Sequence, residues 1–182
     1  MPGIVVYASK YGSTAEYACL VAKKLNTEAL AASEAPFKAV LKANFVVLGS
    51  PIYGYSVLPE MERFLKENRA ILAEKPVAAF VVCGDTLWNP KAGEGGHKNL
   101  EKLTLFLPSR PIATAVLGGR MIMEELDTED GPRIRAFYER IGREATGFDR
   151  MEENRALDFV DAIKDWLESS GTQGAGHRRT GV

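Results

Sequence analysis

A short turn rich in hydroxyl groups has the residue types of an anion site. Residues 9–14 read S-K-Y-G-S-T and lie between an apolar run and a helical pattern. The first N–H groups of a helix have no partners within it, and the helix dipole favours negative charge there. Gly12 would let the backbone approach a phosphate, while Ser9, Ser13 and Thr14 could donate hydroxyl hydrogen bonds. The turn predicts a phosphate site, with simple capping of the helix by Ser and Thr as the alternative.

The two common nucleotide motifs do not fit this turn. The pattern G-x-G-x-x-G is absent from the chain, which disfavours a dinucleotide site. The pattern G-x-x-x-x-G-K-[ST] is also absent, which disfavours hydrolysis of ATP or GTP.

Two later turns place aromatic side chains after apolar runs. Residues 49–55 read G-S-P-I-Y-G-Y, and residues 83–88 read C-G-D-T-L-W. Tyr53 and Trp88 stand where turns usually carry small polar residues, and aromatic rings pair well with a flat ligand. Local packing would explain either ring alone. Together with the phosphate turn, they predict two rings on opposite sides of a cleft.

The apolar runs before these turns predict buried strands. They are apolar on both alternations, which is typical of parallel strands that helices cover on both faces. Strands are expected at residues 3–8, 27–31, 45–48, 77–82 and 112–117. Helices are expected at residues 15–25, 58–67, 100–107, 130–144 and 154–167, and a short helix or turn at 35–43. This alternation predicts an α/β doubly wound, five-stranded parallel sheet, with one extra helix before the C-terminal helix. Ligands of such sheets bind beyond the carboxyl ends of the strands.

Composition limits the partners. The chain has 182 residues, of which 46% are hydrophobic and 26% charged, as in an ordinary globular domain. A net charge of -1 provides no global attraction to nucleic acid or an anionic membrane. The two cysteines and two histidines form no disulfide framework or metal motif, so we expect no metal and a reducing cytoplasm.

The two ends of the chain differ from the domain between them. The N-terminal apolar run is too short for a secretory signal, and no run reaches the ~20 apolar residues of a membrane helix. Residues 169–182 lack apolar periodicity. We therefore expect one domain over residues 1–168 and a disordered tail over 169–182.

The three turns, in this order, resemble those of the flavodoxins, small FMN-binding proteins with a parallel sheet of order 2-1-3-4-5. The phosphate loop of that family, [ST]-x-[ST]-G-x-T, is similar to residues 9–14, with Tyr11 at the middle hydroxyl position. The family's aromatic–glycine pair resembles Tyr53-Gly54, and its loop C-G-D-[ST]-x-[YW] resembles residues 83–88. The resemblance covers roughly residues 3–117 and the last helix.

The resemblance implies an FMN cofactor, with its phosphate on the first loop and its ring between Tyr53 and Trp88. It also implies that the Gly54 carbonyl turns toward the flavin N5 after reduction by one electron. The implied cofactor-binding residues are Ser9, Lys10, Tyr11, Gly12, Ser13, Thr14, Pro51, Ile52, Tyr53, Gly54, Cys83, Gly84, Asp85, Leu87 and Trp88. No catalytic residue is assigned. Cys83 is expected to be a small buried residue rather than a redox thiol.

The resemblance leaves carrier and enzyme open. The carrier flavodoxins that this chain resembles are strongly acidic, whereas its own net charge is -1. Six basic residues are expected near the cleft and would suit an anionic substrate. They are Lys10, Lys91, His97, Lys98, Arg110 and Arg120. The extra helix and Gly118-Gly119-Arg120 resemble, more weakly, the menaquinone-dependent protoporphyrinogen dehydrogenases.

Three functions are therefore considered. The main prediction is electron transfer with a redox partner protein. The first alternative is an FMN-dependent oxidoreductase acting on a porphyrinogen or a quinone. The second alternative is a flavin-free interaction module on the same fold.

Overall fold

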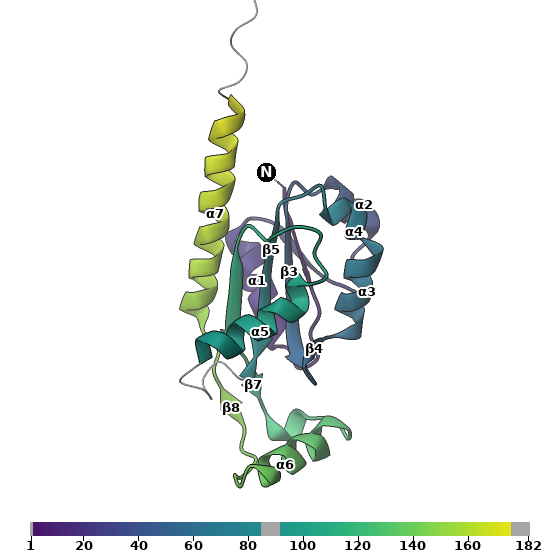
Figure 1. The fold of residues 1–182 in the computed structure, drawn as a ribbon, viewed down its shortest axis with the longest axis vertical. Coiled ribbons are helices and arrows are strands. Elements are labelled where there is room, and N and C mark those ends of the chain that lie inside the picture. Colours follow the sequence, from purple (N-terminus) through teal and green to yellow (C-terminus); the bar gives the residue numbers. More distant parts are fainter. Residues whose placement is uncertain (1, 85–91, 176–182) are drawn as a thin grey trace, which may run out of the picture.

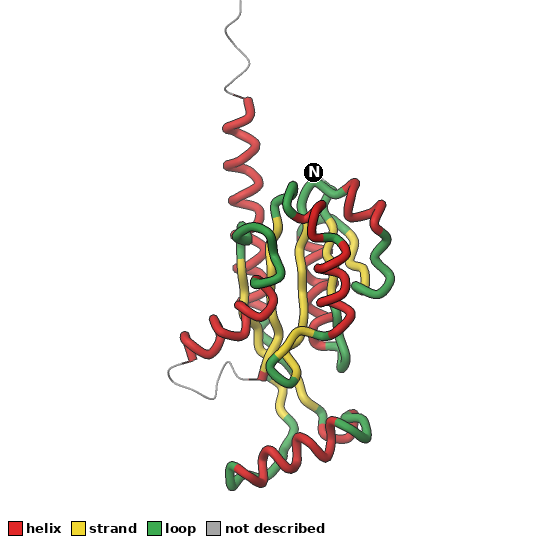
Figure 2. Tube along the Cα trace, turned by 45° about the vertical axis from the view of Figure 1, so that its right-hand side comes forward, coloured by secondary structure: helices red, strands yellow, loops and turns green. Residues whose placement is uncertain are grey.

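The chain forms one parallel sheet covered by helices on both faces (Figures 1 and 2). The computed structural model describes residues 2–84 and 92–175. The parallel strands run in the order β2-β1-β3-β5-β6. Their bounds are β1 (Ile4–Tyr7), β2 (Glu28–Ala31), β3 (Val46–Tyr53), β5 (Val77–Cys83) and β6 (Thr114–Gly118). A short strand, β4 (Ser56–Val57), pairs antiparallel with β3. Apart from β4, this is the predicted order 2-1-3-4-5, so the predicted fold class is confirmed.

Each face of the sheet carries its own hydrophobic core. One face is covered by α1 (Ser13–Lys24) and α7 (Glu153–Ala175). The other is covered by α2 (Phe37–Lys42), α3 (Pro59–Glu67), α4 (Arg69–Leu72) and α5 (Ala92–Thr104). Successive residues of a strand point to opposite faces. Val5 accordingly packs in the α1–α7 core and Val6 in the α3 core, and both are fully buried.

Strand β3 is longer than its apolar run predicted. The expected strand ended at residue 48, but pairing with β5 continues to Pro51, and Ile52 and Tyr53 pair with β4. Gly54 and Tyr55 then turn the chain with φ values of 53° and 66°. Positive φ at both central residues is the geometry of a tight hairpin turn. Pro51, Ile52 and Tyr53 are therefore strand residues rather than members of an open loop.

An insertion follows β6 and lies beyond the carboxyl ends of the parallel strands (Figures 1 and 2). We call this end of the sheet its carboxyl edge. We define the insertion as residues 119–150. It contains β7 (Arg120–Met121), the 3-10 helix η2 (Met123–Glu125), α6 (Asp130–Arg140) and β8 (Phe148–Asp149). Its two ends pair with each other, since β7 and β8 form a separate antiparallel ladder. Helix α6 is the extra helix predicted before the C-terminal one.

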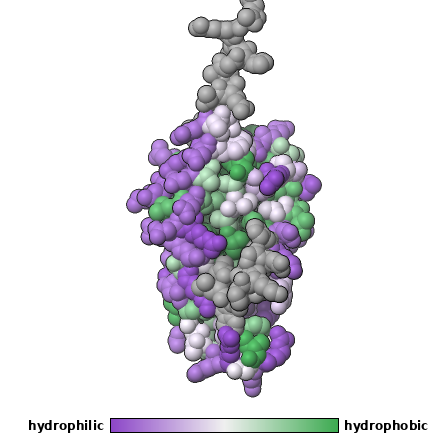
Figure 3. Space-filling view, turned by 60° about the vertical axis from the view of Figure 1, so that its left-hand side comes forward, coloured by the Kyte–Doolittle hydropathy of each residue, from purple (hydrophilic) through white to green (hydrophobic). Residues whose placement is uncertain are grey.

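Two helices extend beyond their predicted bounds. Helix α5 begins at Ala92 rather than near residue 100, so the glycine-rich stretch 93–96 lies in a helix. Helix α7 continues to Ala175, so the first part of the segment expected to be a disordered tail is helical. Within the described ranges, no helix is long and apolar enough to cross a membrane. On the face drawn in Figure 3, hydrophobic residues form small separate areas among hydrophilic ones.

Candidate functional site

The backbone of the first loop leaves the start of α1 open. Gly12 precedes the helix with φ 92° and ψ -33°, and no side chain caps the helix. The Ser9 Oγ accepts a hydrogen bond from the Gly12 N–H at 3.2 Å, which leaves the Ser9 hydroxyl hydrogen available to donate. The capping alternative is therefore not what the structure shows. The hydroxyl groups surround a helix N-terminus that has free N–H groups.

Ser13 links this loop to the insertion. Its Oγ accepts a hydrogen bond from the Arg120 N–H at 3.0 Å and lies 3.5 Å from the Arg120 carbonyl oxygen, at the limit for donation. Ser13 and Thr14 are both buried in the first turn of α1. The first loop is therefore in direct contact with the start of the insertion.

The side-chain polar groups of Lys10 and Tyr11 also contact the insertion. The Lys10 Nζ lies 2.6 Å from an Asp130 carboxylate oxygen and 2.7 Å from one of Asp127. The Tyr11 hydroxyl donates to Asp130 at 2.8 Å. Both side chains were expected to bind the cofactor. Instead, the carboxylates of the insertion bind both polar groups, so the ammonium charge of Lys10 is already balanced.

This cluster changes the ionisation of its members. The backbone N–H of Asp130, followed by the ammonium group of Lys10, lowers the pKa of Asp127 to about 2. For Asp130, burial raises the pKa, but hydrogen bonds from Lys10 and Tyr11 outweigh it, so the pKa is lowered. Hydrogen bonds to the two aspartates raise the pKa of Lys10. Burial raises the pKa of Tyr11. Near neutral pH the cluster therefore has two carboxylates and one ammonium group.

A pocket of about 280 Å³ opens beside the first loop, at the ends of β1 and β2. Ser9 and Gly12 line one side of it, and Glu60 from the first turn of α3 lines another. The remaining lining residues are Tyr7, Ala8, Ala15, Ala31, Ala32 and Ser33. The first loop is thus accessible from the carboxyl edge of the sheet.

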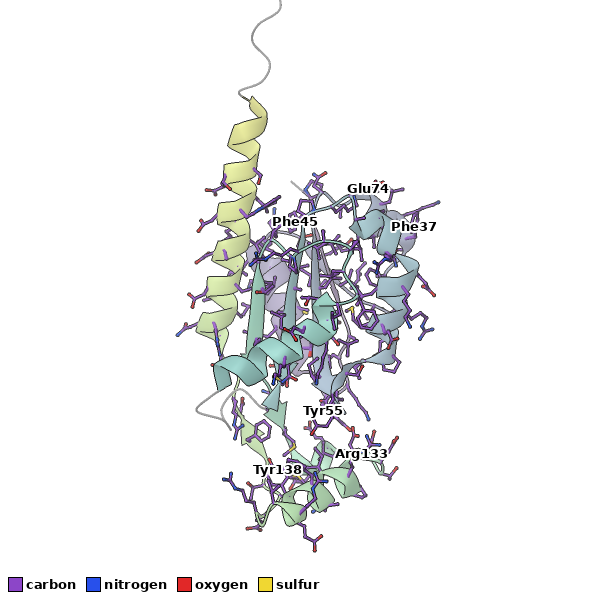
Figure 4. All side chains as sticks on the ribbon, viewed as in Figure 1. Phe37, Phe45, Tyr55, Glu74, Arg133 and Tyr138 are labelled. Atoms are coloured by element: carbon purple, nitrogen blue, oxygen red, sulfur yellow. The ribbon has the colours of Figure 1, made fainter. Side chains whose placement is uncertain are left out.

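Tyr53 lies next to the first loop. Its ring contacts that of Tyr11 edge to face, with centroids 5.9 Å apart and planes at 75°. Burial, followed by the neighbouring Tyr11, raises the pKa of Tyr53 to about 12. Tyr55, two residues later, is 83% exposed at the edge that faces the insertion (Figure 4). The second expected loop therefore places Tyr53 beside the first loop. The Lys102 Nζ lies over the Tyr55 ring, 4.8 Å from the ring centroid.

The third loop begins at a buried cysteine. Cys83 ends β5, and the Asn99 side-chain amide lies 3.5 Å from its sulfur. The next residue, Gly84, accepts a hydrogen bond at its carbonyl from the Arg150 guanidinium, at 2.7 Å. The expected cofactor contacts Asp85, Leu87 and Trp88 lie outside the described residues.

The base of the insertion is held by a buried tyrosine. The Tyr17 hydroxyl donates to the Gly118 carbonyl at 2.9 Å and accepts from the Glu152 N–H at 2.6 Å. The Glu152 carboxylate in turn accepts from the Gly118 N–H at 2.9 Å. These bonds join α1, the end of β6 and the start of α7 at the carboxyl edge. We call this group the Tyr17 clamp.

The expected cationic cluster is only partly present. The Arg120 guanidinium is hydrogen-bonded to Glu16 and lies 3.6 Å from an Asp149 oxygen, and Lys10 is bound as described. Lys98 and Arg110 are exposed. Lys91 and the His97 side chain lie outside the part of the chain that the structure describes. The expectation of a free cationic cleft is therefore wrong for Lys10 and Arg120, because insertion carboxylates and Glu16 balance their charge.

Sequence reasoning did not identify Asp127, Asp130, Tyr17, Glu152 or Arg150. The Asp127 Oδ1 accepts the N–H groups of Glu129 and Asp130, so its position before a helix was a recognisable signal of local capping. Its contact with Lys10 had no signal in the sequence.

Comparisons with known proteins identify the family and the fold. The order of the parallel sheet and the helices on both of its faces define a flavodoxin-like fold. A family model described as "Flavodoxin domain" matches residues 4–144, and the chain belongs to that family. None of the curated proteins compared with the chain matches it.

Solved structures show the same fold. Oxidised Flavodoxin 1 from Bacillus cereus matches with a TM-score of 0.56 and 15% identity, over 92% of this chain and 98% of that one. A flavodoxin from Streptococcus pneumonia TIGR4 matches with a TM-score of 0.54 and 15% identity, over 93% and 99% of the two chains. At this identity the likeness establishes the fold alone.

Proposed function

We propose that this flavodoxin-domain protein binds FMN at the carboxyl edge of its sheet and exchanges electrons with a redox partner protein. FMN, when bound, supplies the capacity to accept and release one or two electrons. The observation that carries the proposal is the uncapped N-terminus of α1, with Gly12 at positive φ and hydroxyl groups around it.

The residues of the first loop fit a phosphate. A dianion would accept hydrogen bonds from the N–H groups of the first turn of α1 and from the Ser9 hydroxyl. Ser13 and Thr14 follow Gly12 in that turn and are the other candidate donors. The side-chain polar groups of Lys10 and Tyr11 do not belong to this set, because Asp127 and Asp130 bind them. We therefore assign phosphate binding to the hydroxyl and amide groups of the first loop, without the ammonium group of Lys10.

Tyr53 fits one side of the flavin ring. It ends β3 beside the first loop, and its ring is already oriented by the edge contact with Tyr11. Gly54, which follows it, has φ 53°, and a Cβ built there would meet nothing within 4 Å. Trp88 remains our prediction for the opposite side of the ring, and the location of the protein in a reducing cytoplasm also remains a prediction.

The phosphate assignment is tested by comparing FMN with riboflavin, which lacks the phosphate. We expect FMN to bind the full chain far more tightly. Ser9→Ala should weaken FMN binding about tenfold or more, by loss of a hydrogen bond to a charged group, and leave riboflavin unchanged. Ser169→Ala, an exposed serine on α7, is the control. Equal affinity for the two flavins would contradict the proposal, and so would the lack of any binding.

The ring assignment is tested with the two tryptophans of the chain. FMN should quench the fluorescence of Trp88 more strongly than that of Trp166, which lies on α7. Each is measured alone, in the variants Trp166→Phe and Trp88→Phe. Equal quenching of both would exclude Trp88 from the ring site.

A second function, an FMN-dependent oxidoreductase, is favoured by the insertion. The insertion contacts the first and third loops, and the net charge of -1 differs from that expected of an acidic carrier. An anaerobic potentiometric titration separates the two functions. Two resolved one-electron steps support the carrier. A single two-electron step, together with turnover of a quinone or porphyrinogen, would replace the carrier with the enzyme.

A further inference from the structure

Arg150 is the residue through which the insertion reaches the third loop. Its guanidinium donates to the Gly84 carbonyl at 2.7 Å and lies over the Phe148 ring, 4.4 Å from the centroid. Phe148 itself packs on Gly84, since a Cβ built on that glycine would lie 3.0 Å from the ring. The guanidinium is thus held between an aromatic ring and a backbone oxygen at the end of β5.

The backbone of Arg150 is held as firmly as its side chain. Its N–H donates to the Gly119 carbonyl at 3.1 Å. Its carbonyl oxygen would lie 2.1 Å from a Cβ built on Gly118, so only glycine permits this close approach. Arg150 therefore has little freedom to move away from the third loop.

Among the residues that the structure describes, Arg150 has no carboxylate partner of the kind that the neighbouring cations have. Lys10 is bound by Asp127 and Asp130, and Arg120 by Glu16 and Asp149. Within residues 2–84 and 92–175, no carboxylate forms an ion pair with Arg150. Its bond to Gly84 is to a neutral carbonyl, which orients the positive charge without cancelling it.

We propose that Arg150 sets the preference of the site for reduced over oxidised flavin. This inference rests on the proposed function, because it requires FMN at the carboxyl edge of the sheet. Reduction of FMN by two electrons with uptake of one proton leaves one negative charge on the ring. A fixed positive charge at Gly84, one of the proposed cofactor contacts, stabilises that product more than the neutral oxidised ring. Arg150 thereby raises the reduction potential of the bound flavin.

The test measures the dissociation constants of oxidised FMN and of FMN reduced with dithionite, for the full chain. Arg150→Gln removes the charge but keeps an amide donor, and Arg150→Lys keeps the charge. Arg133→Gln makes the same change of charge on the exposed face of α6, where that arginine pairs with Glu129. The readout is the ratio of the two constants, since a purely structural role would weaken both flavin forms alike.

We expect Arg150→Gln to reduce the preference for reduced FMN about fivefold, as for a unit charge partly screened by solvent. By the two-electron conversion, this equals a fall of about 20 mV in the reduction potential. Arg150→Lys should remain within about twofold of the wild type. Arg133→Gln should leave the ratio unchanged.

Two results would overturn the inference while leaving FMN binding established. One is an unchanged ratio in Arg150→Gln. The other is the same change of ratio in Arg150→Lys and Arg150→Gln, which would assign the effect to the guanidinium hydrogen bond rather than to charge. Failure of the wild-type chain to bind FMN would instead overturn the proposed function and this inference together.

Discussion

Gly12 adopts a backbone conformation that residues with a Cβ avoid. Its φ of 92° is unfavourable for L-residues, although a Cβ there would approach nothing closer than Glu16 Oε1, at 4.0 Å. The cost of Gly12→Ala should therefore come from the backbone alone. We expect a loss of about 1–3 kcal/mol in the free energy of unfolding, measured by urea denaturation.

Gly131 provides the matched comparison for Gly12. It lies in the first turn of α6, and a Cβ there would make an ordinary contact with Leu126 at 3.8 Å. Because alanine is the better helix former, Gly131→Ala should be neutral or stabilising by about 0.5–1 kcal/mol. Equal losses in the two variants would show that strain at Gly12 is absent.

The Lys10–Asp127–Asp130 cluster should make stability depend on pH in the acid range. The pKa of Asp127 is lowered to about 2, from about 3.9 in an unfolded chain. A carboxyl group with a lowered pKa stabilises the fold fully above its unfolded pKa, and this stabilisation is lost as the pH falls through the folded value. We expect Asp127→Asn to flatten the loss of thermal stability of the wild type between about pH 4 and pH 2.

Asp161→Asn is the control for this pH dependence. Asp161 is an exposed carboxylate on α7, 3.6 Å from Lys164. Its replacement should leave the acid limb of the stability profile parallel to that of the wild type. A parallel limb for Asp127→Asn would show that the cluster does not form in solution.

Only part of the site could be predicted from single residues. The hydroxyl groups and Gly12 were identified because a helix N-terminus has a local pattern. The contact of Lys10 with Asp130 could not be predicted, because Asp130 lies 120 positions away and no local pattern couples the two. The contact of Arg150 with Gly84 could not be predicted for the same reason, because the two residues lie 66 positions apart.

The Tyr17 clamp belongs to the scale of elements, because one hydroxyl group joins α1, β6 and α7. Tyr17→Phe should leave the Gly118 carbonyl and the Glu152 N–H without this buried partner. We expect a loss of about 1–3 kcal/mol in the free energy of unfolding, measured by denaturant titration.

Tyr55→Phe is the control for the clamp. Tyr55 is 83% exposed, so solvent reaches its hydroxyl group, and the change should be within about 0.5 kcal/mol of neutral. A loss in Tyr17→Phe no larger than this would mean that water replaces the clamp.

Elements were predictable where burial was uniform. The strands buried on both faces were found because their apolar runs are continuous, as in β5, where all residues from Val77 to Cys83 are buried. The end of β3 was not predicted because the hairpin turn that follows it was not recognised. Gly54 and Tyr55 form this turn, and Tyr is an unusual residue at positive φ. The length of α7 was missed because its last turns lack the apolar stripe that identified its start.

At the scale of the whole molecule, the sheet separates two cores. Val5→Ala and Val6→Ala remove the same atoms from opposite faces of β1. Each should cost about 2 kcal/mol. Native-state hydrogen exchange should rise mainly in α1 and α7 for Val5→Ala, and mainly in α3 for Val6→Ala. Identical exchange patterns would indicate that the two cores open together.

The pairing of β7 with β8 holds the two ends of the insertion side by side. The insertion is therefore a segment that another could replace, which we call a cassette. Arg120 and Asp149 are partners in one ladder, so the insertion begins after β6 and ends before α7 at nearly the same point. A short turn could join these ends at little cost in loop-closure entropy, and so could a segment of quite different length. The same domain could therefore exchange this cassette for others, changing which molecules reach the sheet edge without disturbing either core.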